Sequence, residues 1–109
     1  MRTVPQLLLA LWALCSGAIC DAADPKAALA RVEQVCQACH GMDGNSQIAE
    51  NPKLGGQYPD YLAKALRDYQ SGLRKNPVMA GFVDKLSKQE IENLAAYYSS
   101  QPAALVTQH

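Results

Sequence analysis

The chain of 109 residues lacks a hydrophobic run long enough to cross a bilayer. Its main apolar segment covers only residues 7–14, whereas a membrane-spanning helix needs about 20 predominantly apolar residues. Arg2 precedes this segment and small residues such as Ala22 follow it, which is the order found in a secretory signal. We therefore predict that residues 1–22 are a removable signal peptide with several candidate cleavage positions, and that residues 23–109 form a single domain. The alternative is an N-terminal anchor that is retained.

Cysteine and histidine are scarce once the predicted signal is removed. Cys36 and Cys39 are then the remaining cysteines, and His40 and His109 are the only histidines. One closely spaced pair of cysteines is too little for a disulfide framework or for a four-thiolate iron–sulfur cluster. A structural zinc site is also excluded, because it takes four ligands and the second histidine is the last residue of the chain.

An excess of charge of one sign is also missing. The chain has 10 basic and 10 acidic residues, so its formal net charge is zero. Long-range steering of a partner by net charge is therefore expected to be weak. The lysines of the predicted domain are dispersed and form no basic stripe, which argues against nucleic acid as a partner. Five of them either form a local basic rim or only aid solubility, namely Lys53, Lys64, Lys75, Lys85 and Lys88.

The most informative feature present is the sequence Cys36-Gln37-Ala38-Cys39-His40, a CxxCH motif. Two thiols three residues apart lie about one helical turn from each other, and the adjacent imidazole lies on the same face. In an exported chain this motif predicts one haem c, attached through thioethers to Cys36 and Cys39, with His40 as an axial ligand of the iron. A thioredoxin-like CxxC is disfavoured, because no βαβ pattern surrounds it.

A second axial ligand can be sought among the methionines of the predicted domain, which are Met42 and Met79. Met42 follows His40 too closely to reach the opposite face of the porphyrin. Met79 lies in a segment between Pro77 and Gly81, where proline and glycine allow the backbone to approach a ligand closely. We therefore predict His/Met ligation of the iron by His40 and Met79. The alternative is that Met79 fills a gap in the core.

The hydrophobic pattern predicts an all-α domain. A first helix is expected to begin at Asp24-Pro25, an N-cap followed by proline. Its apolar face would consist of Leu29, Val32, Val35 and Cys36. This helix would bring both cysteines to the core.

Two further helices are expected. One runs from about Asp60 to Gly72, and another follows the capping box Ser87-Lys88-Gln89-Glu90. The apolar side of the last helix would consist of Ile91, Leu94, Ala95 and Tyr98. Residues 41–57 and 73–86 are expected to be loops, and the segment from Gln101 to the C-terminus a frayed tail.

These features together resemble the small bacterial class I cytochromes c, which are exported, monohaem electron carriers. The resemblance covers residues 28–102. The residues that carry it are Cys36 to Gly44, Pro52-Lys53-Leu54-Gly55-Gly56-Gln57, Met79 and the closing helix from Leu86 to Tyr98. It implies the small cytochrome c fold, with three to five helices around one covalently attached haem. It also implies that the Pro52 carbonyl accepts a hydrogen bond from the second nitrogen of His40.

The resemblance further implies a haem pocket that excludes water. The pocket would be lined by Leu54, Tyr58, Leu62, Leu66, Tyr69, Phe82 and Tyr98. Arg67 and Arg74 are candidate partners of a haem propionate, because arginine offers a forked donor to carboxylates. The alternative is that both are ordinary solvated charges.

The predicted function is outer-sphere transfer of single electrons in the periplasm. No substrate bond changes, so we expect no catalytic residues and no enzyme activity. The expected partners are redox proteins, such as a membrane cytochrome complex, an oxidase or a dehydrogenase, that contact a monomer transiently, without stable membrane insertion after processing. Two alternatives stay open: an electron-transfer subunit of a dehydrogenase or oxidase complex, and a ligand-binding or sensing haem protein if Met79 is labile.

Overall fold

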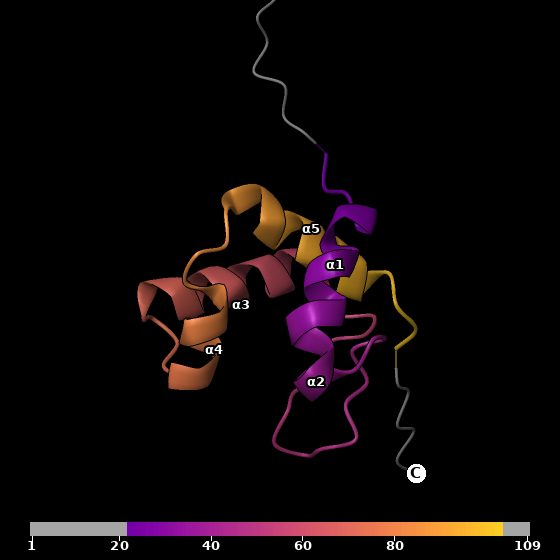
Figure 1. Ribbon diagram of the computed structural model, residues 1–109, viewed down its shortest axis with the longest axis horizontal. Coiled ribbons are helices and arrows are strands. Elements are labelled where there is room, and N and C mark those ends of the chain that lie inside the picture. The colour runs from indigo at the N-terminus through magenta and orange to yellow at the C-terminus, as the bar shows by residue number, and fades with distance from the viewer. Residues whose placement is uncertain (1–21, 104–109) are drawn as a thin grey trace, which may run out of the picture.

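The computed structural model describes residues 22–103, which form four helical segments and no strand (Figure 1). In chain order these are a composite N-terminal helix over residues 26–40, α3 (Pro59–Ser71), α4 (Pro77–Val83) and α5 (Lys88–Ser99). The predicted all-α class is confirmed. The predicted signal peptide lies outside the described residues except for Ala22, and so do residues 104–109.

The N-terminal helix changes its winding along its length. Its parts are the 3₁₀ turn η1 (Lys26–Ala28), α1 (Leu29–Arg31), the π-helical turn η2 (Val32–Cys36) and α2 (Gln37–His40). The carboxylate of Asp24 accepts a hydrogen bond from the backbone N–H of Lys26 at 2.9 Å. The predicted start of this helix is therefore confirmed, whereas its π-helical turn was not predicted.

α3 and α5 begin and end close to the predicted positions. α3 ends before Gly72, whose φ of 80° is left-handed and therefore favours glycine. At the start of α5, Ser87 Oγ accepts a hydrogen bond from the backbone N–H of Glu90 at 3.0 Å. The predicted apolar side of α5 is buried in full.

The prediction of a loop over residues 73–86 is wrong in its middle, where α4 lies. Asn76 caps this helix and Pro77 occupies its first turn. An N-cap residue followed by proline is the same signal that marks Asp24-Pro25. Gly81, four residues after Pro77, interrupts the helical pattern, so the hydrophobic pattern alone does not extend this signal into a helix.

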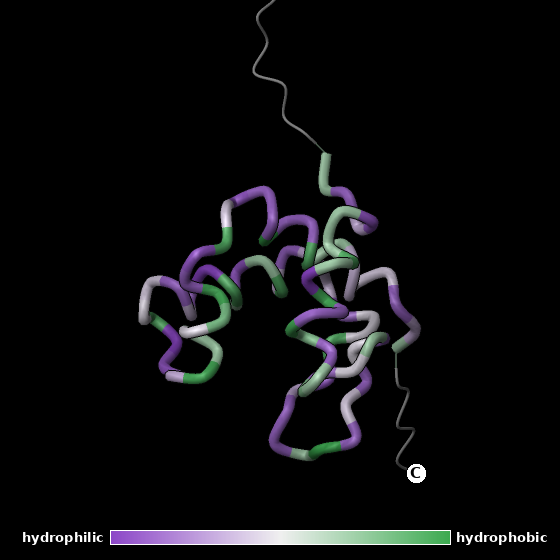
Figure 2. The backbone as a smooth tube through the Cα atoms, viewed as in Figure 1, coloured by the Kyte–Doolittle hydropathy of each residue, from purple (hydrophilic) through white to green (hydrophobic). Residues whose placement is uncertain are grey.

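The hydrophobic core lies between the N-terminal helix, α3 and α5, with contributions from the end of α4 and the segment after it. Its members are Ala28, Val32, Leu62, Ala63, Tyr69, Val83, Leu86, Ile91, Leu94, Ala95 and Tyr98. Hydrophobic and hydrophilic residues alternate along the helices (Figure 2). Leu29, expected on the apolar face, is 40% exposed. Ala28 takes the inward position instead, because it lies four residues before the fully buried Val32.

The long loop before α3 folds back against α5 and the segment after it. The backbone N–H of Gly56 donates to the Tyr98 carbonyl at 3.0 Å. The side chain of Asn45 donates to the Pro102 carbonyl at 2.9 Å. The predicted frayed tail is therefore wrong for its described part.

Among residues 22–103, no helix has both the length and the apolar character that crossing a membrane requires.

Candidate haem-binding site

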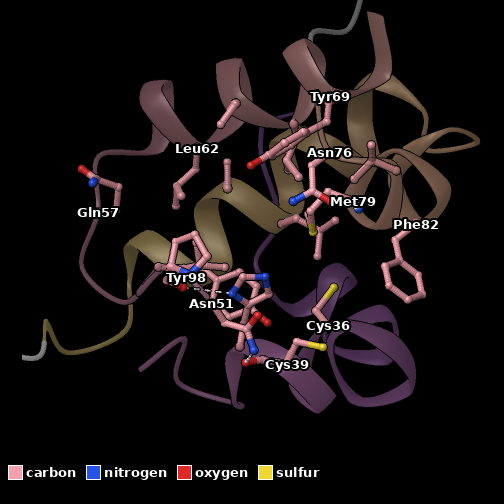
Figure 3. Close-up of a pocket in the computed structure, with 18 of the residues that line it drawn as sticks. Cys36, Cys39, Asn51, Gln57, Leu62, Tyr69, Asn76, Met79, Phe82 and Tyr98 are labelled. Atoms are coloured by element: carbon pink, nitrogen blue, oxygen red, sulfur yellow. Dashed lines mark hydrogen bonds between the residues drawn. The ribbon is translucent and has the colours of Figure 1, made fainter. Parts of the chain in front are cut away.

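A cavity of about 580 Å³ opens between the N-terminal helix, α3, α4 and the loop before α3 (Figure 3). This volume lies within the range of about 300–1,000 Å³ that is usual for cofactor pockets. All six residues that we predicted to bind the cofactor line it, namely Cys36, Cys39, His40, Pro52, Leu54 and Met79. Cys36 and Met79 thus line the same cavity although they are 43 positions apart in the sequence.

The N-terminal helix supplies one wall of the cavity. Cys36 is half-buried, Cys39 is exposed, and both are free thiols. Burial raises the pKa of the Cys36 thiol above its ordinary value, so this thiol is protonated near neutral pH. Both cysteines were expected at the core; Cys36 packs against it, whereas Cys39 is exposed, and both line the cavity. The π-helical turn directly before the CxxCH motif fits this position, since such turns often occur at functional sites.

The imidazole of His40 is buried and oriented from the loop before α3. Its Nδ1 donates a hydrogen bond to the Pro52 carbonyl at 3.0 Å, which is the bond that the resemblance implies. With the proton on Nδ1, the lone pair of Nε2 is available to a metal. A neighbouring bond joins the same segments, because the side chain of Asn51 donates to the Cys39 carbonyl at 3.0 Å (Figure 3).

α4 supplies the facing wall. Met79 lies in its first turn and is partly buried, and its sulfur points toward the side of the cavity that carries Cys36 and Cys39 (Figure 3). Met42 does not line the cavity and its side chain is 39% exposed. Of the two candidate methionines, the structure therefore brings Met79 to the site.

Six of the seven predicted pocket residues line the cavity, and the exception is Tyr58, which is 79% exposed. Tyr58 is the residue before α3 and has an extended backbone, so its side chain does not follow the helical pattern. Tyr61 lines the cavity in its place. It precedes Ala65 and Tyr69 by one and two helical turns, a spacing from which its role could have been predicted.

Tyr98 is buried and lines the cavity, and Tyr97 beside it on α5 is partly buried. Burial raises the pKa of the Tyr98 hydroxyl well above its ordinary value. This hydroxyl donates to the Gly41 carbonyl at 3.4 Å, and the neighbouring Tyr97 donates to the Met42 carbonyl at 2.6 Å. α5 thus holds the backbone directly after the CxxCH motif.

The two arginines proposed as propionate partners differ in position. Arg74 lines the cavity, with its guanidinium 4.8 Å from the centre of the Tyr69 ring. Arg67 does not line the cavity and pairs instead with Glu92 at 3.0 Å. The structure therefore supports only Arg74 as a candidate.

Comparison with known proteins shows the family to which the chain belongs. The family model described as "Cytochrome C oxidase, cbb3-type, subunit III" matches residues 23–97. The chain belongs to the class I c-type cytochromes. The predicted family and fold are thus confirmed, and membership implies a c-type haem at the CxxCH motif.

The chain is similar to cytochrome c4 of Thiocapsa roseopersicina, with 46% identity over 79 residues that cover 72% of this chain and 41% of the relative. The structure titled "Crystal structure of reduced recombinant cytochrome c4 from Pseudomonas stutzeri" matches with a TM-score of 0.69 and 44% identity, over 74% of this chain and 47% of that one. The chain therefore spans less than half the length of these relatives.

A more distant relative carries a functional name. The "Thiosulfate dehydrogenase electron acceptor" of Thiomonas intermedia is 43% identical over 65 residues, which cover 59% of this chain and 30% of the relative. The name of this relative describes an electron acceptor, which agrees with the predicted class of electron carrier.

The cavity fits the group that the family implies. It offers two thiols and an imidazole on one wall and a thioether on the facing wall, and much of the remaining lining is apolar or aromatic. These are the groups that attach a c-type haem, ligate its iron and exclude water from it.

Proposed function

We propose that this chain carries single electrons through one haem c held in the cavity. Thioethers to Cys36 and Cys39 would attach the haem, and His40 and Met79 would ligate its iron. The observation that carries the proposal is that an oriented imidazole and a thioether lie on facing walls of one cavity. The haem, when bound, supplies an iron that gains and loses one electron.

The residues of the chain would fix the ligands and keep the site dry. The Pro52 carbonyl holds His40 in the tautomer that leaves Nε2 available. Leu62 and Leu66 contribute apolar surface at the inner wall, and exclusion of water together with a thioether ligand raises the reduction potential. Val78 and Phe82 line the same cavity and are 64% and 50% exposed. We propose that electrons enter and leave at this open side.

Met79→Ala is the decisive variant. We expect it to lose the weak red absorption band that is typical of sulfur-ligated ferric haem, and to bind carbon monoxide and cyanide. Its reduction potential is expected to fall by on the order of 100 mV, within the range of roughly 0.8 V that axial ligands span.

Met42→Ala is the matched control, because Met42 lies two residues after His40 and outside the cavity. This variant is expected to keep the spectrum and the potential of the wild type. An unchanged spectrum and potential in Met79→Ala would refute the ligand assignment. Tight binding of carbon monoxide by the wild type would instead favour the ligand-binding alternative.

We also propose that residues 1–22 are a signal peptide, that residues 23–109 form the cytochrome domain and that the protein works in the periplasm. In support, the family match begins at residue 23. The backbone N–H of Asp24 donates to Asn93 Oδ1 on α5 at 2.8 Å, so contacts of the folded domain are present at this position. N-terminal sequencing of the protein recovered from the periplasm tests all three statements.

The proposed partners are redox proteins that contact a monomer transiently, as in weak electron-transfer encounters that bury less than about 1,200 Å². The relative that is named an electron acceptor of thiosulfate dehydrogenase supports a dehydrogenase as the donor. The name of the matching family, an oxidase subunit, supports the alternative of a subunit in a larger complex. Co-purification of the chain with membranes or with a larger enzyme would decide for the subunit.

A further inference from the structure

α4 has little of its own to hold it in place. It has seven residues, whereas isolated helices shorter than about 12–15 residues are marginal in water. Its buried residue is Val83, at the opposite end of the helix from Met79. Val78 and Phe82 line the cavity and are 64% and 50% exposed, and Met79 is only partly buried against the core. Apolar packing therefore holds this part of α4 incompletely, and the position of Met79 depends also on other contacts.

The start of α4 is held by the side chain of Asn76. Its Oδ1 accepts hydrogen bonds from the backbone N–H groups of Val78 at 3.0 Å and of Met79 at 3.1 Å. One of these bonds fixes the backbone of the proposed iron ligand itself. The group of Asn76 that does this is the carbonyl oxygen of its amide, an acceptor.

The end of α4 is held from α3 by the side chain of Gln70. Its Nε2 donates to the Val83 carbonyl at 2.7 Å and to the Leu86 carbonyl at 2.8 Å. These two bonds join α3 to the last residue of α4 and to the residue before the cap of α5. The group of Gln70 that does this is the NH₂ of its amide, a donor.

We propose that Asn76 and Gln70 are positioning residues that hold α4 so that Met79 stays on the iron. This inference rests on the ligand role proposed above for Met79. The two amides set the fraction of time during which Met79 is displaced. An external ligand binds the iron only while Met79 is displaced, so the apparent affinity of that ligand reports how often Met79 leaves the iron.

The test exchanges each amide for its acid in the holo-protein. Asn76→Asp keeps the acceptor oxygen, so its affinity for imidazole in the ferric state is expected to stay within about twofold of the wild type. Gln70→Glu loses both donors and brings carboxylate oxygen toward two carbonyls, so its affinity for imidazole is expected to rise about tenfold. Asn76→Ala loses the cap, and its affinity is expected to rise about fivefold. The same chemical change is thus expected to have little effect at Asn76 and a large effect at Gln70.

Ser87→Ala is the matched control for general loosening. Ser87 caps α5 through one bond of the same kind and does not line the cavity. This variant is expected to lower the melting temperature while its imidazole affinity and red band stay unchanged. Gln70→Leu removes the donors without adding charge and is expected to raise the affinity as well, so it replaces Gln70→Glu if that variant does not fold.

The outcomes separate this inference from the proposed function. A wild type without the red band refutes ligation by Met79, and the inference with it. If the wild type has the band but Asn76→Ala and the Gln70 variants bind imidazole as it does, the inference alone is refuted. An increase of affinity in Ser87→Ala as large as in Asn76→Ala also refutes it, because the effect would then be general.

Discussion

The haem is expected to be required for folding, and the volume of the cavity gives the size of the effect. In the apo-protein, a cavity of about 580 Å³ would lack the haem that is proposed to occupy it. Cavities in protein cores cost about 24 cal/mol per Å³, so the upper bound is about 14 kcal/mol. The true cost is smaller, because this cavity opens to solvent and its walls can collapse.

Even half of this cost is comparable with the entire free energy of unfolding of a small domain, which is about 5–15 kcal/mol. The described part of the chain also has a small core, and small domains bury only about 60% of the surface that their unfolded chains expose. We therefore expect the variant Cys36→Ser/Cys39→Ser, which cannot attach haem covalently, to lack native tertiary structure when no haem is supplied.

The assay compares this double variant with the wild type, both produced in a host that attaches haem to c-type cytochromes. Thermal unfolding followed by circular dichroism should show a cooperative transition for the wild type alone, and protease should digest the variant rapidly. Met79→Ala is the control, since it removes a proposed ligand but keeps both attachment sites. A cooperative, protease-resistant double variant free of haem would refute this reasoning.

Two further predictions concern α5 and the loop that packs on it. Burial raises the pKa of Tyr98 above the ordinary value of 10.0, so the unfolded chain loses this proton first and stability falls as the pH rises above about 10. Tyr98→Phe should flatten that alkaline decline in chemical denaturation, and an equally steep decline would show that Tyr98 is not its cause. Gly44→Ala should cost at least about 1–3 kcal/mol, because a Cβ would lie 2.7 Å from both Gly55 N and Tyr98 Cδ1 at a φ of 74°. Gly72→Ala is the control, because Gly72 has a similar φ of 80° but no atom would lie within 4 Å of its added Cβ. Its melting temperature should therefore fall less than that of Gly44→Ala. Equal falls in the two variants would show that crowding of the Cβ at Gly44 does not contribute.

Much of the fold could be predicted, because local signals agree with the tertiary structure in α3 and α5. Pro59 as the first residue of α3, Gly72 after it and Ser87 before α5 mark helix ends through local chemistry alone. The CxxCH motif likewise carries its chemistry within five consecutive residues, so its role does not depend on the rest of the fold.

The features that were missed depend on contacts between distant parts of the chain. Pro102 is held by Asn45, which lies 57 residues earlier. Asn51 reaches the cavity because its side chain bonds the end of α2. α4 has a local start signal, but its end is held by Gln70 of α3. No periodic pattern in the sequence reports such bonds, and a short helix interrupted by glycine gives too weak a pattern to stand without them.

The wide turn at Val32–Cys36 has a consequence for changes of chain length. A π-helical turn holds about one residue more than an α-helical turn. Deleting one exposed residue there, such as Gln34, would restore ordinary winding and leave the cysteines of the motif facing the same way. The same deletion inside α3 would rotate all later residues of that helix by about 100° and turn Tyr69 away from the cavity. The N-terminal helix can therefore shorten by one residue without losing its orientation toward the cavity, whereas α3 cannot.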